Sequence, residues 1–308
     1  MKRYQKLNDG NHIPVFGLGM WESEEALIGD AINSAVTNFG YRHIDCASIY
    51  GNEQAVGKAL EGVIGNLVKR EDLFITSKLW CTDHKSEDVE KACKSSLSDL
   101  RLDYLDLYLM HFGIALQKRG DDLEPLGKDG KVLLDAVSIQ ETWQAMEKLV
   151  KKGLVKSIGV ANFTTTMLVD LLTYANIKPV INQIELHPYN TQEQLVEFCK
   201  YKDISVTAYS PLGRYGVKDI KGPKLFDEPI IKTLTKKYKK TPAQILLNWG
   251  IMRGTIVIPK STNPERIEEN SYIFDFKLTK KDRSDIDSLN KNYRFVNPMD
   301  WWAVPYFA

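Results

Sequence analysis

Short hydrophobic runs alternate with amphipathic segments along most of the chain. Each run is rich in leucine or β-branched residues, which favours a buried strand, and each is followed by a segment with a helical period of apolar positions. The predicted strands span residues 16–19, 42–45, 73–79, 105–111, 155–160, 181–185, 205–210 and 255–258. The predicted helices span residues 25–38, 53–61, 86–100, 139–152, 164–174, 192–201, 229–238 and 263–271. Eight strands that are each followed by a helix predict a closed parallel barrel, the (β/α)8 or TIM barrel fold.

The first residues predict a β-hairpin ahead of the barrel. Residues 4–7 and 12–15 flank a turn that contains Asp9 and Gly10, and Asp-Gly is a favoured hairpin turn. We expect this hairpin to close the bottom of the barrel like a plug. An open, doubly wound sheet is the alternative, but the turn after the first strand lacks the third glycine of the nucleotide-binding fingerprint. We therefore expect one barrel domain over residues 1–308.

Two long loops and an aromatic tail interrupt the alternation. Residues 112–136 and 211–228 are rich in glycine, lysine and aspartate, and long loops in a compact domain are usually functional lids. An aromatic tail needs a buried place, and we expect to find it at the mouth of the barrel. Residues 292–308 contain Phe295, Trp301, Trp302, Tyr306 and Phe307.

Composition narrows the possible classes of function. The 308-residue chain has 43% hydrophobic and 26% charged residues and a formal net charge of +1, which offers no strong field to nucleic acid or acidic membranes. The four cysteines have no CxxC spacing, so neither a disulfide framework nor a zinc site is expected. The N-terminus has no hydrophobic signal segment. We expect a cytoplasmic monomer or weak dimer that binds no metal.

Four polar side chains stand where successive predicted strands end. Asp45 and Tyr50 follow the second strand, Lys78 ends the third and His111 ends the fourth. Taken singly, each has a structural explanation, such as a buried ion pair between Lys78 and Asp45. Adjacent strands lie about 5 Å apart, however, so all four can converge at the end of a barrel where catalytic groups sit. Their joint placement favours an active site.

The chemistry of these four residues suits proton donation to a carbonyl oxygen. A phenol with a pKa near ~10 is a weak acid, but the neighbouring Lys78 ammonium should lower the pKa of Tyr50. Asp45 would keep Lys78 charged, and His111 would hydrogen-bond the carbonyl oxygen and orient it. The set contains no nucleophile–base pair and no metal-ligand cluster, so a hydride must come from a bound cofactor.

The sequence resembles the aldo-keto reductase family over nearly its whole length. The matching segments are residues 40–53, 73–80, 100–111, 153–163, 180–189, 207–213 and 256–270. The resemblance implies a (β/α)8 barrel without a Rossmann fingerprint, and an NADPH-dependent reductase that acts on an aldehyde or aldose. It also implies that Tyr50 is the general acid of a tetrad that Lys78, Asp45 and His111 complete.

Three residues at the ends of later strands are candidates for holding a nicotinamide. Tyr209 offers a flat ring for stacking, and Asn162 and Gln183 have amides that suit a carboxamide. The two amide residues can also be simple turn-formers. The family resemblance implies the cofactor roles, together with pyrophosphate contacts from the backbone of Ser210 and Leu212.

The segment after the eighth strand predicts a phosphate site. Asn263 and Pro264 form a helix cap followed by proline, and a helix N-terminus attracts anions. Lys260, Ser261 and Arg266 add charge and hydrogen-bond donors there, so we expect NADPH, with its 2′-phosphate, in preference to NADH. The residues that the family resemblance places at the adenosine end of the cofactor are Lys260, Ser261, Thr262, Arg266, Glu269 and Asn270.

The substrate pocket that the resemblance implies is aromatic. Residues 293–301 look closer to sugar-reducing members such as xylose reductase, whereas residues 135–162 are similar to aldose-6-phosphate reductases. Two alternatives stay open: a ketone, steroid or prostaglandin reductase with the same tetrad, and a non-catalytic relative that keeps the cofactor site. The implied pocket walls are Trp21, Trp80, Phe112 and Trp301.

The lid differs in charge from the pattern that the family implies. Glu22 stands where many relatives have lysine, and the segment 211–216 contains Arg214 where many relatives place serine and aspartate. The usual lysine–aspartate latch over the pyrophosphate cannot form as such. We hypothesise a charge-swapped latch in which Glu22 meets Arg214 or Lys218; the alternative is unpaired surface charges on a mobile loop.

Overall fold

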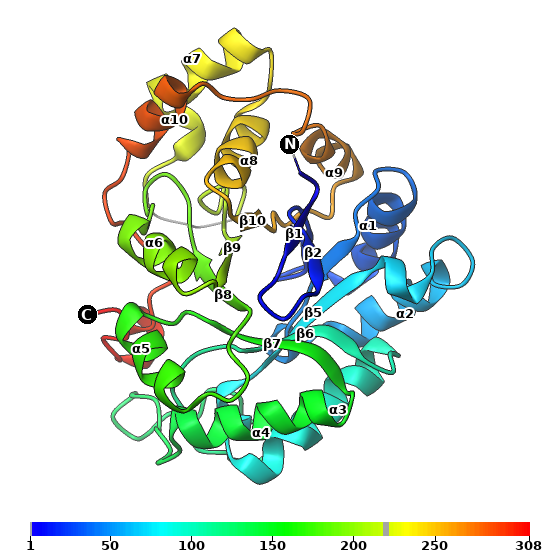
Figure 1. The fold of residues 1–308 in the computed structure, drawn as a ribbon, viewed down its shortest axis with the longest axis vertical. Helices are drawn as coiled ribbons and strands as arrows, with labels where there is room; N and C mark the ends of the chain where they lie inside the picture. Colours follow the sequence, from blue (N-terminus) through cyan, green and yellow to red (C-terminus); the bar gives the residue numbers. More distant parts are fainter. Residues whose placement is uncertain (1, 218–221) are drawn as a thin grey trace.

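The computed structural model describes residues 2–217 and 222–308, and its main feature is a sheet of eight parallel strands. The strand order is β10-β9-β8-β7-β6-β5-β4-β3, so strands that are consecutive in the chain are neighbours in the sheet. Helices follow the strands and lie on the outside (Figure 1). The strands are β3 (Leu18–Gly19), β4 (His43–Asp45), β5 (Phe74–Leu79), β6 (Leu105–Met110), β7 (Val155–Ala161), β8 (Ile181–Glu185), β9 (Ser205–Tyr209) and β10 (Ile256–Val257).

The first and last strands of this sheet meet and close the barrel. Isolated parallel bridges join Phe16 to Val257 and Gly19 to Lys260. The regular parts of β3 and β10 are shorter than predicted, because pairing across this seam uses single bridges instead of a continuous ladder. The predicted (β/α)8 fold is confirmed.

A two-stranded hairpin covers the amino-terminal end of the barrel, in agreement with the sequence. β1 (Tyr4–Lys6) pairs antiparallel with β2 (His12–Pro14). The Asn8 amide donates to backbone carbonyls just ahead of β8 and β9, at 3.0 and 2.8 Å. Leu7 and Ile13 are buried among apolar side chains of the barrel strands. The hairpin therefore closes the end opposite the carboxyl ends of the strands, in the centre of the ring in Figure 1.

The predicted helices are all present, with bounds within two residues of those expected. Their amphipathic faces pack on the strands and on one another, and this interface forms the main core. The α-helices of the described chain are α1 (Glu25–Thr37), α2 (Glu53–Val63), α3 (Ser86–Leu100), α4 (Ile139–Lys151), α5 (Thr165–Tyr174), α6 (Glu193–Tyr201), α7 (Pro229–Tyr238), α8 (Pro242–Met252), α9 (Pro264–Ser271), α10 (Lys280–Asp287) and α11 (Met299–Trp302).

Three of these helices, α8, α10 and α11, were not predicted. Every residue from 243 to 250 of α8 is buried, so this helix has no polar face to produce an amphipathic period. In α10 the reverse holds, because only Asp282 and Ile286 are buried. Thr241 and Thr279 begin these two helices with capping boxes, which are a sequence signal for a helix start.

The interior contains the four cysteines, Cys46, Cys81, Cys93 and Cys199, as free and buried thiols. Across residues 2–217 and 222–308, no helix has the length and apolar character needed to cross a bilayer. The same described ranges contain no cluster of three or more His, Cys, Asp or Glu side chains suited to a metal ion.

Candidate active site

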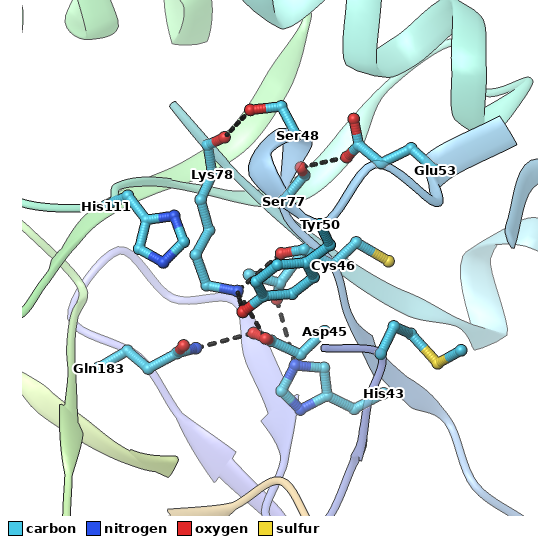
Figure 2. Close-up of polar contacts among 12 residues, drawn as sticks. His43, Asp45, Cys46, Ser48, Tyr50, Glu53, Ser77, Lys78, His111 and Gln183 are labelled. Carbon is cyan, nitrogen blue, oxygen red and sulfur yellow. Dashed lines mark hydrogen bonds and ion pairs between the residues drawn. The ribbon is translucent and has the colours of Figure 1, made fainter. Parts of the chain in front are cut away.

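Four polar side chains converge at the carboxyl ends of β4, β5 and β6 (Figure 2). The Lys78 Nζ donates to the Asp45 Oδ1 at 2.6 Å and to the Cys46 carbonyl at 2.6 Å. It also donates to the Tyr50 hydroxyl at 3.3 Å. The His111 ring lies edge-on to the Tyr50 ring, with centroids 6.1 Å apart. The structure thus brings together all four residues of the expected tetrad.

A short turn after β4 carries Tyr50 back over the strand ends. Tyr50 ends the 3-10 helix η1 (Ser48–Tyr50), and Gly51 follows with a φ of 67°. Glycine adopts this left-handed conformation without steric cost. The Asn52 amide then donates to the Met20 carbonyl at 2.9 Å, and α2 begins at the next residue. The position of the phenol therefore depends on how α2 packs behind it.

Lys78 is completely buried, and its charge is held by its partners. Burial lowers the pKa of Lys78, but the Asp45 carboxylate and the Tyr50 hydroxyl raise it by more, so that the pKa lies above its ordinary value. A buried ion pair of this kind is costly unless it is well hydrogen-bonded. Here the ammonium has three acceptors, which matches its three N–H donors.

The pKa of Tyr50 corrects one expectation from the sequence. Lys78 lowers the pKa of Tyr50 as predicted, but burial raises it by more, and the result is a pKa of about 12. The phenol is therefore neutral at physiological pH and retains a proton that it can donate. Burial removes the water that would stabilise the phenolate, and the Asp45 carboxylate raises the pKa further, so the two together outweigh the ammonium.

His111 is held as a neutral ring. Burial lowers the pKa of His111 well below its ordinary value, and the nearby charge of Lys78 lowers it further. The ring stacks on Phe112 with centroids 5.5 Å apart and meets the edge of Trp80 at 5.1 Å. Its Nδ1 is buried and has no partner in the described chain. A neutral imidazole in this place can donate one hydrogen bond to a carbonyl oxygen.

The three candidate nicotinamide residues are linked to the tetrad by hydrogen bonds. Gln183 Nε2 donates to the second oxygen of Asp45 at 2.7 Å. Asn162 Nδ2 donates to the His111 carbonyl at 2.9 Å, and the Tyr209 hydroxyl donates to Asn162 Oδ1 at 2.7 Å. This network cannot be predicted from the sequence, because strand-end positions do not show which amide reaches which partner. It joins the proposed cofactor residues to the proton-donating ones.

The N-terminus of α9 has the features of an anion site. The Asn263 side chain caps this helix by accepting the Arg266 N–H at 2.9 Å. The side chains of Lys260 and Arg266 are exposed there, Thr262 is half-buried and Ser261 is buried. Two cations beside free helix N–H groups can bind a phosphate.

Glu269 and Asn270 of α9 differ in whether their side-chain oxygens are free to bind a ligand. The Glu269 carboxylate accepts the Thr241 hydroxyl at 2.6 Å, so it helps to hold the start of α8. Asn270 is buried, and its Oδ1 has no partner in the part of the chain that the structure describes. Because buried polar atoms are almost always paired, this free acceptor suits a ligand donor such as the amino group of adenine. The residues present at α9 thus fit the adenosine end of a dinucleotide.

The loop that follows β9 contacts Trp21 through the side chain of Arg214. The Arg214 guanidinium lies over the Trp21 ring, 4.4 Å from its centroid. Burial lowers the pKa of Arg214, and the charge of Glu22 opposes this. Within residues 2–217 and 222–308, no ion pair joins Glu22 to Arg214. The alternative partner in the latch hypothesis, Lys218, lies outside the described residues. Ser210 and Leu212, at the start of the lid, are half-buried.

An aromatic cluster forms the wall of the site beside His111. Trp80 and Phe112 are buried in it, with ring centroids 6.1 Å apart. The tail adds Trp302 and Tyr306, whose centroids lie 5.2 and 5.4 Å from that of Phe112. Trp301, the tail residue expected in the pocket, is 39% exposed, and the adjacent Trp302 is 1% exposed. Consecutive residues of the short helix α11 point in different directions, and composition cannot choose between two adjacent tryptophans.

The fold and the site define a class of protein: a β/α barrel with a network of polar side chains at the carboxyl ends of its strands and a candidate phosphate site at the start of α9. Residues 15–291 match the model of the aldo/keto reductase family, and the chain belongs to this family. It is therefore an oxidoreductase, of a family whose members generally use a nicotinamide cofactor.

Individual relatives are similar over nearly the whole chain. Aldose reductase C of Dictyostelium discoideum is 49% identical over 308 residues, which cover 98% of this chain and 94% of the relative. Aldo-keto reductase family 1 member A1 of Gallus gallus is 48% identical over 297 residues, or 95% and 90% of the two chains. The solved aldose reductase of Schistosoma japonicum superimposes with a TM-score of 0.92 at 42% identity, and covers 99% of this chain and 98% of its own.

Proposed function

We propose that the protein is an NADPH-dependent aldehyde or aldose reductase in which Tyr50 is the general acid. The observation that carries this proposal is the contact of the neutral Tyr50 phenol with Lys78, which Asp45 holds in place. A half-buried proton donor beside a buried ammonium suits the transfer of a proton to a developing alkoxide. The similarity to aldose reductases supports the substrate class.

The residues of the site divide the chemistry between them. When bound, the nicotinamide cofactor supplies the hydride that reduces the carbonyl carbon. The neutral ring of His111 donates a hydrogen bond to the carbonyl oxygen and orients it. The Tyr50 hydroxyl gives its proton to the same oxygen as negative charge develops there. Lys78 then stabilises the phenolate that remains, because its ammonium lies 3.3 Å from the hydroxyl oxygen.

The cofactor would be held at two places. Tyr209, with Asn162 and Gln183, would bind the nicotinamide, and their hydrogen bonds to His111 and Asp45 would keep it in register with the proton donor. Main-chain groups of Ser210 and Leu212 would contact the pyrophosphate. At the other place, the start of α9 would hold the adenosine 2′-phosphate with Lys260, Ser261, Thr262 and Arg266, and the adenine with Glu269 and Asn270.

Removing both cations at α9 is expected to separate the two nicotinamide cofactors. The Lys260→Ala/Arg266→Ala double variant should weaken NADPH binding by at least about a hundredfold, because each charge-assisted bond to a phosphate contributes about 1.5–3 kcal/mol. NADH lacks the 2′-phosphate, so its affinity should change by less than about threefold. Fluorescence titration of the purified protein with each cofactor measures both constants.

The matched control removes two exposed lysines from α10, a helix other than the one that carries the proposed phosphate site. The Lys280→Ala/Lys281→Ala variant changes net charge by the same amount and should leave both affinities unchanged. Equal losses of NADPH and NADH affinity in the α9 variant would contradict the role given to Lys260 and Arg266.

Nicotinamide absorbance in the presence of candidate substrates tests the function directly. We expect oxidation of NADPH with a simple aldehyde and with an aldose, and much slower turnover with a bulky ketone. Absence of turnover with every aldehyde while NADPH still binds would refute the proposed activity and favour a non-catalytic relative. Faster turnover with the ketone would instead assign the protein to the ketone, steroid or prostaglandin reductases.

Several expectations about the whole protein belong with this proposal. We keep a single barrel domain over residues 1–308 and a monomer or weak dimer as its expected organisation. The four buried, free cysteines suit a reducing compartment, and we place the protein in the cytoplasm on that ground.

A further inference from the structure

Glu185, the last residue of β8, is a completely buried carboxylate outside the tetrad. Its Oε1 accepts the Phe295 N–H at 2.7 Å and lies 2.8 Å from the His187 Nε2. Its Oε2 accepts the Val296 N–H at 3.0 Å. Both oxygens of one strand-end side chain are therefore used to hold two consecutive peptide groups of the C-terminal tail.

Other contacts tie the same part of the tail to the turn after β8. The Tyr189 carbonyl accepts the N–H groups of Lys291 and Tyr293, at 3.1 and 2.9 Å. The Arg294 guanidinium donates to Gln192 Oε1 at 2.9 Å. Residues 291–296 thus make several of their hydrogen bonds to the end of β8 and the turn that follows it, and Lys291 also pairs with Glu228.

The tail continues from this anchor to the wall of the site. Trp302 and Tyr306 pack against Phe112, which stacks on His111. Tyr306 also accepts the Gly113 N–H at 2.8 Å. The tail therefore runs from the Glu185 anchor to the aromatic wall beside His111.

The hydrogen-bond pattern requires a carboxylate at this position. A glutamine would present an oxygen on one side only, and its NH2 group would face an N–H donor. Buried donors left without an acceptor cost about 1–3 kcal/mol each. A single change from oxygen to nitrogen would therefore remove at least one of the two backbone hydrogen bonds of the anchor while keeping the size and shape of the side chain.

We propose that Glu185 is a positioning residue that sets substrate specificity by anchoring the tail at Phe295 and Val296. The inference rests on the proposed aldehyde reductase activity. The anchored tail narrows the pocket and favours compact aldehydes such as glyceraldehyde, which depend on the walls for orientation. Bulky aromatic aldehydes depend less on a narrow pocket.

The Glu185→Gln variant tests this proposal. We expect its KM for glyceraldehyde to rise about tenfold, with kcat and NADPH affinity within about twofold of wild type. The KM for naphthaldehyde should stay constant or fall, so that the preference for the smaller substrate drops about tenfold or more. An unchanged preference in a folded variant, or a fall in kcat with the KM values unchanged, would overturn the proposal.

Asp106→Asn is the control, because Asp106 is also a buried strand carboxylate that accepts a backbone N–H, from Ile75 at 3.0 Å. Unlike Glu185, it also pairs with Arg70 and Lys156. It lies at the start of β6, far from the tail, and should leave the preference between the two aldehydes unchanged. An equal shift in this control would show that any loss of a buried carboxylate has the same effect, and would overturn the proposal.

A second measurement needs neither the variant nor the activity. In wild-type protein, hydrogen exchange should show the amides of Phe295 and Val296 protected, and more slowly exchanging than the exposed part of the tail around Trp301. Rapid exchange at Phe295 and Val296 would overturn the anchor even if the variant failed to fold. A lack of aldehyde turnover in the wild type, with these amides protected, would refute the proposed function and the specificity role that rests on it, but not the anchor.

Discussion

Replacing Tyr50 by phenylalanine is expected to lower kcat/KM for aldehyde reduction by about a thousandfold, within the range that general acid catalysis contributes. Phenylalanine keeps the ring, which lies 5.0 Å from the Lys78 Nζ and packs edge-on to His111. Only the hydroxyl that accepts from Lys78 is lost. Steady-state kinetics with a simple aldehyde measures the loss, and fluorescence titration should show NADPH affinity within about twofold of wild type.

Tyr209→Phe is the matched control for this experiment. It removes a second hydroxyl from the same site, the one that donates to Asn162 at 2.7 Å. Because Tyr209 has no place in the proton transfer, its loss should reduce kcat/KM by no more than about tenfold. A Tyr50→Phe variant that retained a tenth of wild-type turnover, or one that merely equalled the control, would remove Tyr50 from the role of general acid.

Gly57→Ala is expected to lower the free energy of unfolding by about 3 kcal/mol or more, at the upper end for overpacking. Gly57 is buried in α2, where the helix crosses the end of α3. A Cβ on Gly57 would lie 2.1 Å from the Asp99 carbonyl oxygen and 2.7 Å from the Leu100 carbonyl carbon. Both atoms belong to the backbone, so the helices must separate. Urea unfolding followed by fluorescence measures the change.

Gly62→Ala, in the same helix, should have the opposite effect. A Cβ at Gly62 would meet no atom within 4 Å, and alanine is the better helix former by about 0.5–1 kcal/mol. The two variants make the same chemical change in one helix and differ in the space available. Similar unfolding free energies for both would show that α2 and α3 do not pack as the structure has them. The displaced α2 of Gly57→Ala should also lower turnover, because this helix begins directly after the turn that carries Tyr50.

The pattern of apolar runs and amphipathic segments determined the barrel architecture and placed the tetrad residues at the ends of its strands. A strand needs only a short apolar run and a helix only an apolar face, so residues near in sequence decide both. Because the strands are parallel and follow chain order around the barrel, their carboxyl ends all lie at one end of it. That is why Asp45, Lys78 and His111 could be placed at one end of the barrel from the sequence. The helix α8 was not predicted, because a helix that is buried on all sides shows no alternation of apolar and polar positions.

Properties that depend on neighbours distant in the chain were decided only by the tertiary structure. The pKa of Tyr50 rises to about 12 because burial exceeds the effect of Lys78, and burial is set by the whole fold. The bond from Gln183 to Asp45 joins residues 138 positions apart. Trp302 is buried against Phe112 and Trp301 is exposed, because α11 turns one side inward. Sequence patterns report local periodicity and strand order, whereas side-chain partners, burial and electrostatic balance exist only once the barrel has closed.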